Sequence, residues 1–235
     1  MLEATLLAAL LAQLGARLLG RRSLSARLVP PVPGRRFATW GLRLLVEFGA
    51  PALVVLLLLG RGDALWAMPP EFLPAALAIG GPEPRLEGAV LLGVTGGTLL
   101  NAALNAWRVR RGKRPIQIGR TPLPQGRGEL PDGAGLAVAA GVSEELYFRL
   151  ALPLLLTAAL GSAHAAFAVA SVLFGLVHRR QGWAGMLATG LAGLALAWVY
   201  LLTGALWLAV AFHAMIDLNG LVVRPWLRFK FARRS

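Results

Sequence analysis

The sequence contains no cysteine among its 235 residues. This excludes disulfide bonds, thiolate metal sites, a cysteine nucleophile and prenylation of a C-terminal cysteine in this chain. Charge is also scarce: Asp, Glu, Lys and Arg make up 15% of the residues, against about 25% in soluble domains. The 24 basic residues outnumber the 11 acidic ones and leave a net charge of +13. Nucleic-acid binding is not predicted, because the arginines stand between apolar blocks and form no single basic face.

Apolar residues are abundant instead, at 57% of the chain, and they come in long blocks. From Leu150 to Val223 the charged residues are Arg179, Arg180 and Asp217, with three histidines beside them. A chain of this length cannot bury so much apolar surface in a soluble core, so it needs lipid around it. The sequence therefore predicts an all-α fold, a polytopic transmembrane helical bundle. Windows of about 20 residues give about seven membrane helices, at residues 2–19, 39–60, 88–107, 134–160, 161–178, 183–202 and 204–223.

The remaining segments complete this organisation. Because no basic residues precede the first apolar run, residues 2–19 are predicted to be a span and not a cleaved signal peptide. Residues 64–81 are apolar but contain Pro69 and Pro70, which favours an interfacial or re-entrant segment. The predicted units are N-terminal membrane helices with a basic cytoplasmic loop at 1–132, a core at 133–223 and a basic amphipathic cytoplasmic tail at 224–235.

Basic loops fall on one side of the membrane when the predicted helices alternate across it. The loop at 61–87 falls on the other side, and its four carboxylates outnumber its two arginines. Positive charge favours the cytoplasmic side, so the N-terminus is predicted outside and the C-terminus in the cytoplasm. The tail suits either an anionic lipid surface or a solvated stop-transfer segment. The Ala, Gly and Arg bias is typical of a high-GC bacterium, which predicts the bacterial inner membrane.

Several residues inside the predicted spans receive a structural interpretation. Arg43 and Glu47 are predicted to pair at i,i+4 spacing in the second span. His164 would lie about 21 Å along the helix from His178, at the opposite membrane face, and is assigned to structure. Glycines at helical spacing are interpreted as close-packing positions: Gly93, Gly96 and Gly97 in the third span and Gly185, Gly190 and Gly193 in the sixth.

A first group of charged residues lies in the segment from Gly141 to Arg149. A charge at the membrane centre costs about 2.5–3.5 kcal/mol on insertion scales. Charged residues in a predicted span are therefore expected to be paired or to have a function. On a helix, Glu144 and Glu145 point about 100° apart. Glu145 lies one turn from Arg149, where the two can pair. One carboxylate is therefore predicted to be neutralised, while Glu144 stays free.

Two further groups each place a histidine at i,i+4 spacing. Phe174 and His178 share one helical face, and so do His213 and Asp217 in the last span. Counted at about 1.5 Å per residue from the basic ends, Glu144 and these polar residues fall in the cytoplasmic half of the membrane. A cavity open to the cytoplasm could collect them.

The sequence lacks the catalytic residues that several classes of membrane hydrolase require. No His-Glu-x-x-His pattern provides a zinc metalloprotease helix. A single Asp lies in a span, which excludes a two-aspartate protease. A serine mechanism stays open, with Ser143 as nucleophile and His178 or His213 as its base, but it leaves both glutamates without a role.

Activation of water by a glutamate and histidines is the other chemistry that the residues allow. Glu144 can act as the general base, and a neighbouring imidazole can hold the water and later pass on a proton. His213 with Asp217 can stabilise an oxyanion. Glu144, His178 and His213 could instead hold a zinc ion with an open position. Spacing does not separate these two versions, so no cofactor is required and zinc is the alternative.

The three groups together resemble the CPBP family of intramembrane proteases, which comprises CAAX proteases and bacteriocin-processing or self-immunity proteins. The resemblance covers about residues 135–220 and implies that the core at 133–223 is catalytic. The motifs that carry it are Glu144-Glu145-x-x-x-Arg149, Phe174-x-x-x-His178 and His213-x-x-x-Asp217, on successive membrane helices.

By this resemblance, Glu144 is the general base and His178 its partner on the water, while His213 and Asp217 stabilise the oxyanion. The other motif residues, Glu145, Arg149 and Phe174, would support the site. Asp217 departs from the prenyl-protein endopeptidase branch, where Asn is commonest and its amide can donate to an oxyanion. Asp217 could donate when protonated, or it could orient His213 as an imidazolium donor. The resemblance therefore supports hydrolysis of a peptide bond more than it supports prenylated substrates.

Two other function classes stay open. The Glu, His and Asp groups could form the relay of a proton-coupled carrier, although such carriers usually have repeats and broken helices that this chain lacks. A non-catalytic immunity or scaffold protein could retain the same fold. For the endopeptidase interpretation, the implied partners are a membrane-associated protein or peptide and the lipid bilayer, with no nucleic acid.

Overall fold

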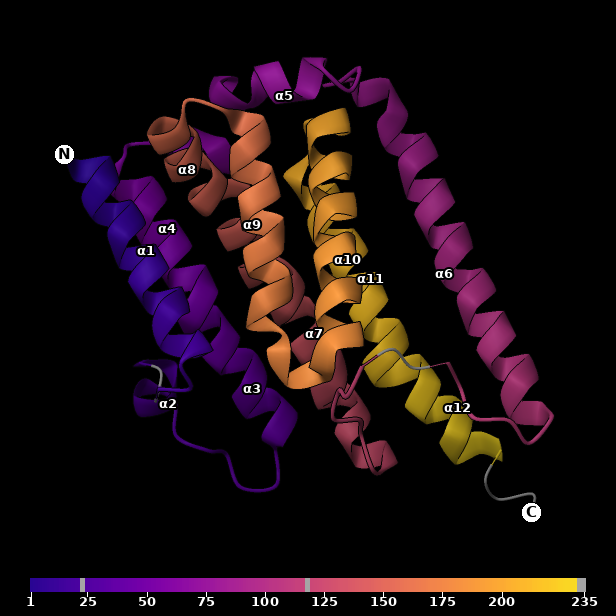
Figure 1. Ribbon diagram of the computed structural model, residues 1–235. Coiled ribbons are helices and arrows are strands. Elements are labelled where there is room, and N and C mark those ends of the chain that lie inside the picture. Colours follow the sequence, from indigo (N-terminus) through magenta and orange to yellow (C-terminus); the bar gives the residue numbers. More distant parts are fainter. Residues whose placement is uncertain (22–23, 117–118, 232–235) are drawn as a thin grey trace.

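The computed structural model describes residues 1–21, 24–116 and 119–231. Within these ranges the chain forms helices and no strand, and the long helices run side by side as a bundle (Figure 1). The predicted all-α fold is confirmed.

Helices occupy every segment that the sequence predicts to be a span. The long helical runs are α1 (Leu2–Leu18), then α3 (Arg36–Leu44) with η1 (Leu45–Gly49) and α4 (Ala50–Leu58), then α6 (Glu87–Arg110), then α7 (Leu130–Glu145) with η6 (Leu146–Ala151) and α8 (Leu152–Leu160), then α9 (Ala163–Val177), α10 (Gly182–Thr203), and finally α11 (Leu206–Leu218) with η8 (Asn219–Val223) and α12 (Arg224–Phe231). Short helices connect them: α2 (Leu24–Leu28), η2 (Gly62–Leu65), η3 (Pro70–Phe72), α5 (Leu73–Leu77), η4 (Pro84–Leu86), η5 (Arg127–Glu129) and η7 (Arg179–Gln181).

Four helices of the described chain are long and apolar enough to cross a membrane. Helix α9 is also apolar but has 15 residues. These helices indicate an integral membrane protein, while the count of about seven membrane helices stays a prediction. The four candidate spans are Arg36–Leu58, Pro84–Arg110, Arg179–Thr203 and Leu206–Phe231.

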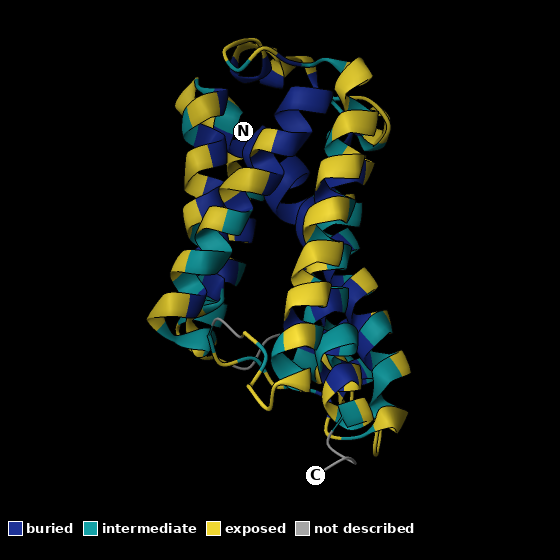
Figure 2. Ribbon diagram, turned by 90° about the vertical axis from the view of Figure 1, so that its right-hand side faces the viewer, coloured by how far each residue is buried: buried dark blue, intermediate teal, exposed yellow. Residues whose placement is uncertain are grey.

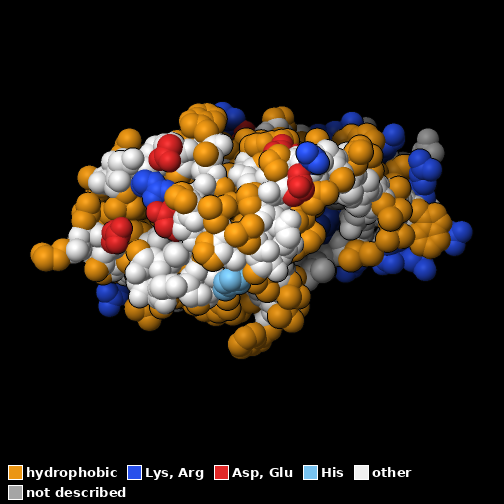
Figure 3. Space-filling view, turned by 90° about the horizontal axis from the view of Figure 1, so that it is seen from above, with side chains coloured by type: hydrophobic (Ala, Val, Ile, Leu, Met, Phe, Trp, Pro, Cys, Tyr) orange, Lys and Arg blue, Asp and Glu red, His pale blue; other side chains and the backbone are white. Residues whose placement is uncertain are grey.

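The bundle has two ends of different composition. The short helix α5 crosses one end, whereas α2, the start of α3, the end of α6 and α12 lie at the other, as the predicted alternation requires (Figure 1). A view onto the α5 end shows acidic and basic side chains interspersed among apolar ones, with basic side chains gathered at the edge of the view (Figure 3). The segment at 64–81 contains short helices and does not run along the bundle. Which end faces the cytoplasm stays a prediction.

π-Helical turns interrupt the runs that start at α3, α7 and α11, and each is followed by a proline two residues after it ends: Pro51, Pro153 and Pro225. A proline has no N–H, and its ring crowds the carbonyl of the residue four positions earlier. In each run that earlier residue lies inside the π-helical turn, where the wider backbone accommodates the ring. The same runs carry Glu145, Arg149 and Asp217, so the prolines shape the helices that bear the predicted site.

The predicted ion pair between Arg43 and Glu47 does not form. The sequence pairs it with Arg43, but the Oε1 atom of Glu47 lies 2.8 Å from Nη1 of Arg17 on α1, and its Oε2 accepts a hydrogen bond from Ser25 Oγ at 2.9 Å. Arg43 instead donates from Nε to the carbonyl of Val29 at 3.1 Å. The prediction was wrong because α1 packs against this run and brings a competing cation from outside the helix.

The core lies among α1, the α3 and α7 runs, α9, α10 and α11, while α6 stays at the periphery (Figure 2). Along α6, the buried residues are Val94 and Asn105. Gly93, Gly96 and Gly97 of α6 face open space, because a Cβ on any of them would meet no atom within 4 Å. Their prediction as close-packing positions was wrong: other helices leave this face of α6 largely uncovered.

Candidate active site

Two close helix approaches create the site. A Cβ on Gly141 of α7 would lie 2.9 Å from the carbonyl oxygen of Val210 on α11. A Cβ on Gly175 of α9 would lie 2.9 Å from the carbonyl oxygen of Met186 and 3.2 Å from Cα of Gly190 on α10. Real Cβ atoms do not approach a backbone this closely, so glycine at these positions allows α7 to meet α11 and α9 to meet α10. Gly190, predicted to be a close-packing position, lies at this approach, although a Cβ on Gly190 itself would meet its nearest atoms at 3.8 Å.

Glu144 lies between two histidines from different helices. Its side chain is 5% exposed, and Oε2 is 3.8 Å from Nε2 of His178 and 3.9 Å from Nε2 of His213. This oxygen has no hydrogen-bond partner within the described chain. Each gap is wider than a direct hydrogen bond, so a water molecule is the natural mediator between these polar groups. The structure thus brings together the three residues that the sequence assigns to one water.

Both imidazoles are oriented through their other nitrogen. Nδ1 of His178 lies 2.7 Å from the carbonyl oxygen of Phe174, and a carbonyl can only accept, so Nδ1 carries the proton. Nδ1 of His213 lies 2.7 Å from Oε1 of Glu145 and donates to that carboxylate. In each ring Nε2 therefore faces Glu144. For a neutral ring this tautomer leaves the Nε2 lone pair free to accept a hydrogen bond.

Glu145 connects His213 to a buried arginine. Its Oε2 lies 3.0 Å from Nε of Arg149, and both side chains are at most 1% exposed. The predicted pairing of Glu145 with Arg149 is confirmed. The additional contact to His213 was not predicted, because its partner stands 68 positions away on α11.

Phe174 packs between the charged groups. Its ring lies 4.4 Å from the Arg149 guanidinium carbon, and it meets the imidazoles of His178 and His213 edge-on, with ring centroids 4.9 Å and 5.8 Å away. Such contacts are attractive for a cation over the ring face and for tilted ring pairs. A Cβ on Gly193 would lie 3.0 Å from Cδ1 of Phe174, so this glycine leaves the room that the ring occupies. Phe174 therefore fixes the rotamers of the groups around it.

Asp217 stands at the more open side of the cluster. Its Oδ2 lies 3.7 Å from Nε2 of His213, and its side chain is 35% exposed. The nitrogen that faces Glu144 thus also faces a second carboxylate.

Ser143 and His164 lie outside this cluster. The hydroxyl of Ser143 donates to the carbonyl oxygen of Ala139 at 2.6 Å, and its Cβ faces Gly49 of the α3 run. This contact occupies the serine on the face of α7 that packs against α3, and it provides no histidine base. His164 lies in the first turn of α9, at the far end of that helix from His178, as predicted.

The distances around Glu144 bear on both the water and the zinc version of the site. Zinc ligands at about 2.0–2.1 Å from the ion lie about 3.3 Å from each other. Two groups that each hydrogen bond the same water at about 2.8 Å lie about 4.5 Å apart. The gaps of 3.8 and 3.9 Å fall between these two spacings. In the part of the chain that the structure describes, no group of three His, Asp or Glu residues is arranged to hold a metal ion. These distances select neither version, and the steps below use the residues of the chain alone.

Comparisons with known proteins agree with the motif analysis. Residues 127–219 match the family model described as type II CAAX prenyl endopeptidase Rce1-like. The match covers less than half of the chain, but it includes every predicted site residue. It confirms the resemblance to CAAX-type membrane proteases over that segment. No curated protein and no solved structure matches the chain.

Proposed function

We propose that this protein is an intramembrane endopeptidase that hydrolyses a peptide bond in a membrane-associated protein or peptide. One observation carries the proposal: the buried Oε2 of Glu144 lacks a hydrogen-bond partner in the described chain and faces Nε2 of both His178 and His213. Burying a carboxylate oxygen without a hydrogen-bond donor costs free energy, and ionisable groups kept inside a membrane at such a cost mark functional sites. The match of residues 127–219 to a protease family supports the same reaction class.

In the proposed first step, Glu144 and His178 hold the attacking water. One hydrogen of the water points to Oε2 of Glu144 and the other to the lone pair of Nε2 of His178. Glu144 removes its proton as the water oxygen bonds to the carbonyl carbon of the substrate. The carbonyl oxygen becomes the oxyanion of a tetrahedral intermediate.

In the second step, His213 stabilises the oxyanion and Glu144 returns its proton. As an imidazolium, His213 keeps its Nδ1 hydrogen on Glu145 and donates from Nε2 to the oxyanion. Protonated Glu144 then gives its proton to the departing amide nitrogen, and the C–N bond breaks. The products are a carboxylic acid and an amine, and the enzyme returns to its starting protonation state.

The decisive experiment compares neighbouring residues in purified, reconstituted protein. We expect the wild type to cleave members of a membrane-peptide library, with products identified by mass spectrometry. Glu144→Gln should reduce turnover by about 10²–10⁴-fold, the usual contribution of a general base. Ser143→Ala is the matched control, because its hydroxyl contacts a helix carbonyl and no site residue. It should cleave at close to the wild-type rate.

Other outcomes would change the assignment. Full activity of Glu144→Gln together with inactive Ser143→Ala would indicate a serine mechanism. Loss of turnover on chelation, with recovery on added zinc, would favour the zinc version. Absence of cleavage by the wild type throughout a library with and without lipidated peptides would favour a non-catalytic immunity or scaffold protein.

A further inference from the structure

A second site lies on a neighbouring face of α11, about 100° around that helix from the catalytic residues. A cavity of about 540 Å³ separates α6 from α10, α11 and η8. Phe212 and Ile216 of α11 line it, whereas His213 and Asp217 on the same helix belong to the catalytic site. Its size falls in the range of about 300–1,000 Å³ that small-molecule sites occupy.

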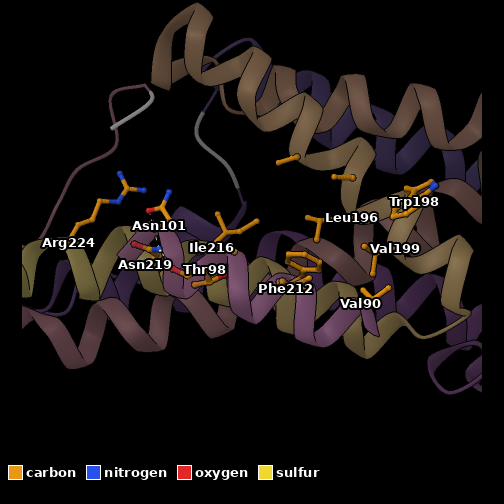
Figure 4. Close-up of a pocket in the computed structure, with 15 residues that line it drawn as sticks. Val90, Thr98, Asn101, Leu196, Trp198, Val199, Phe212, Ile216, Asn219 and Arg224 are labelled. Atoms are coloured by element: carbon orange, nitrogen blue, oxygen red, sulfur yellow. Dashed lines mark hydrogen bonds between the residues drawn. The ribbon is translucent and has the colours of Figure 1, made fainter. Parts of the chain in front are cut away.

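Most of the cavity is apolar. At one end its walls are formed by Val90 of α6 and by Trp198 and Val199 of α10 (Figure 4). Gly93 and Gly97 of α6 line it as well, and a Cβ on either would meet nothing within 4 Å. These glycines therefore do not bring helices together; they leave space between them.

The other end of the cavity is polar (Figure 4). Asn219 is 6% exposed, and its Nδ2 donates to the carbonyl oxygen of Thr98 at 3.4 Å and to Oδ1 of Asn101 at 3.3 Å. Since a carbonyl only accepts, the contact with Thr98 fixes the orientation of the amide. Oδ1 of Asn219 is then left buried, without a hydrogen-bond donor among the residues described.

Arg224 adds an unpaired donor to this end. Its Nη1 donates to the carbonyl oxygen of Ile116 at 2.7 Å, which holds the guanidinium in place. Its Nε is buried and lacks an acceptor in the described ranges. A buried donor and a buried acceptor left unpaired each carry a desolvation cost, which a ligand with the complementary groups would remove.

Further basic residues lie near the polar end. Arg108 and Arg110 end α6, and Arg228 and Lys230 belong to α12, which packs against that end of α6. Arg110 stacks over the Phe231 ring at 5.4 Å, which ties the two helices together. Asp217 is the carboxylate close enough to Arg224 to interact with it electrostatically, and the basic residues of α6 and α12 outnumber it. The positive charge that predominates near the polar end favours an anionic ligand.

We propose that this cavity binds an anionic phospholipid of the bilayer, with a hydrocarbon chain between α6 and α10 and a hydroxyl-bearing phosphodiester headgroup at Asn219 and Arg224. The phosphate accepts from Nε of Arg224, and a headgroup hydroxyl donates to Oδ1 of Asn219. A hydrocarbon chain suits the apolar end because it has no polar groups. An irregular peptide would leave its N–H and C=O groups unpaired against those walls.

The test measures retained lipid by native mass spectrometry. The full-length protein is reconstituted in bilayers of equimolar phosphatidylcholine and phosphatidylglycerol, extracted in mild detergent, and its bound lipids are identified. We expect the wild type to retain phosphatidylglycerol in preference to phosphatidylcholine. Gly97→Leu should fill the cavity and reduce retained lipid several-fold. Gly96→Leu is the matched control, since Gly96 is equally open but does not line the cavity, and it should retain lipid like the wild type.

A second variant tests the headgroup. Arg224→Gln should keep a bound lipid but lose the preference, so that the two lipids are retained equally. Thermal unfolding of each variant checks that the fold is intact, and Gly97→Leu tests the cavity if Arg224→Gln does not fold. Unchanged retention in Gly97→Leu, equal loss in Gly96→Leu, or a lipidated polypeptide as the retained mass would each overturn the proposal.

Discussion

Glu145 on α7 and His213 on α11 share a hydrogen bond of 2.7 Å between Oε1 and Nδ1, and the other oxygen of Glu145 lies 3.0 Å from Nε of buried Arg149. One carboxylate therefore orients an imidazole of the site and neutralises a cation. Glu145 is a positioning residue, whereas Glu144, one position earlier, faces the reacting groups.

Glu145→Gln should lower stability as well as activity. The substitution removes the counter-charge of Arg149, whose side chain is 1% exposed. Removing one partner of a buried pair costs about 3–5 kcal/mol. We expect a lower unfolding temperature and lower yield, measured in parallel with peptide cleavage.

The double variant Glu145→Gln with Arg149→Met is the control. It removes both charges, so most of the lost stability should return. The Gln carbonyl can still accept from Nδ1 of His213, so part of the activity should return as well. A double variant no more stable than Glu145→Gln would contradict the charge argument.

Asp217→Asn should retain cleavage. The amide replaces a carboxylate that lies 3.7 Å from Nε2 of His213, and its N–H can donate to an oxyanion. We expect kcat within about tenfold of the wild type, because one neutral hydrogen bond is worth about 1 kcal/mol. Inactivation as complete as in Glu144→Gln would show that the negative charge of Asp217 is required.

Gly141→Ala should separate α7 from α11. The new methyl would lie 2.9 Å from the carbonyl oxygen of Val210, and a backbone atom cannot move aside as a flexible side chain can. Overpacking costs about 1–3 kcal/mol, and the shift would also lengthen the contact between Glu145 and His213. We expect lower thermal stability and reduced turnover.

Gly96→Ala is the matched substitution for this prediction. Gly96 also lies within a helix, but a Cβ there meets nothing within 4 Å. Alanine should raise stability slightly, since it favours a helix by up to about 1 kcal/mol over glycine. Equal effects of the two substitutions would argue against the close approach at Gly141.

The ion pair of Arg61 and Glu71, at the α5 end, is expected to make a pH-dependent contribution to the free energy of unfolding. Their side chains are hydrogen bonded at 2.5 and 3.0 Å, and the hydrogen bond from Arg61 lowers the pKa of Glu71. A lowered pKa in the folded state gives stability that is present above the unfolded pKa and lost as pH falls through the folded one. The stability difference between wild type and Glu71→Gln should be at most about 1 kcal/mol at neutral pH, because the pair is partly exposed.

This difference should shrink in acid. Unfolding curves of both proteins at neutral pH and at successively lower pH measure it. A difference that stays constant below the pKa of Glu71 would show that the pair does not act through charge.

The predicted orientation places both the basic loop before α7 and the C-terminus in the cytoplasm. Reporter fusions after residue 130 and after residue 235 should both give a cytoplasmic signal. A periplasmic signal from either fusion would contradict the orientation.

The sequence by itself determined the helical class and the candidate residues. Long apolar blocks cannot fold without lipid, which fixes a helical membrane protein before any contact is known. Within helices, i,i+4 spacing correctly paired Glu145 with Arg149, because these neighbours share a face whatever surrounds them. The scarcity of charge made the remaining polar residues conspicuous, and three of them, Glu144, His178 and His213, do lie together.

Tertiary structure decided every relation between helices. The same i,i+4 rule failed for Arg43 and Glu47, because Arg17 from another helix competes for that carboxylate. Spacing could not tell that Gly190 of α10 faces another helix closely while Gly97 of α6 lines a cavity. The link from Glu145 to His213 spans 68 positions and depends on how closely α7 and α11 approach. Such distances follow from side-chain packing between helices, which the periodicity of a single helix does not encode.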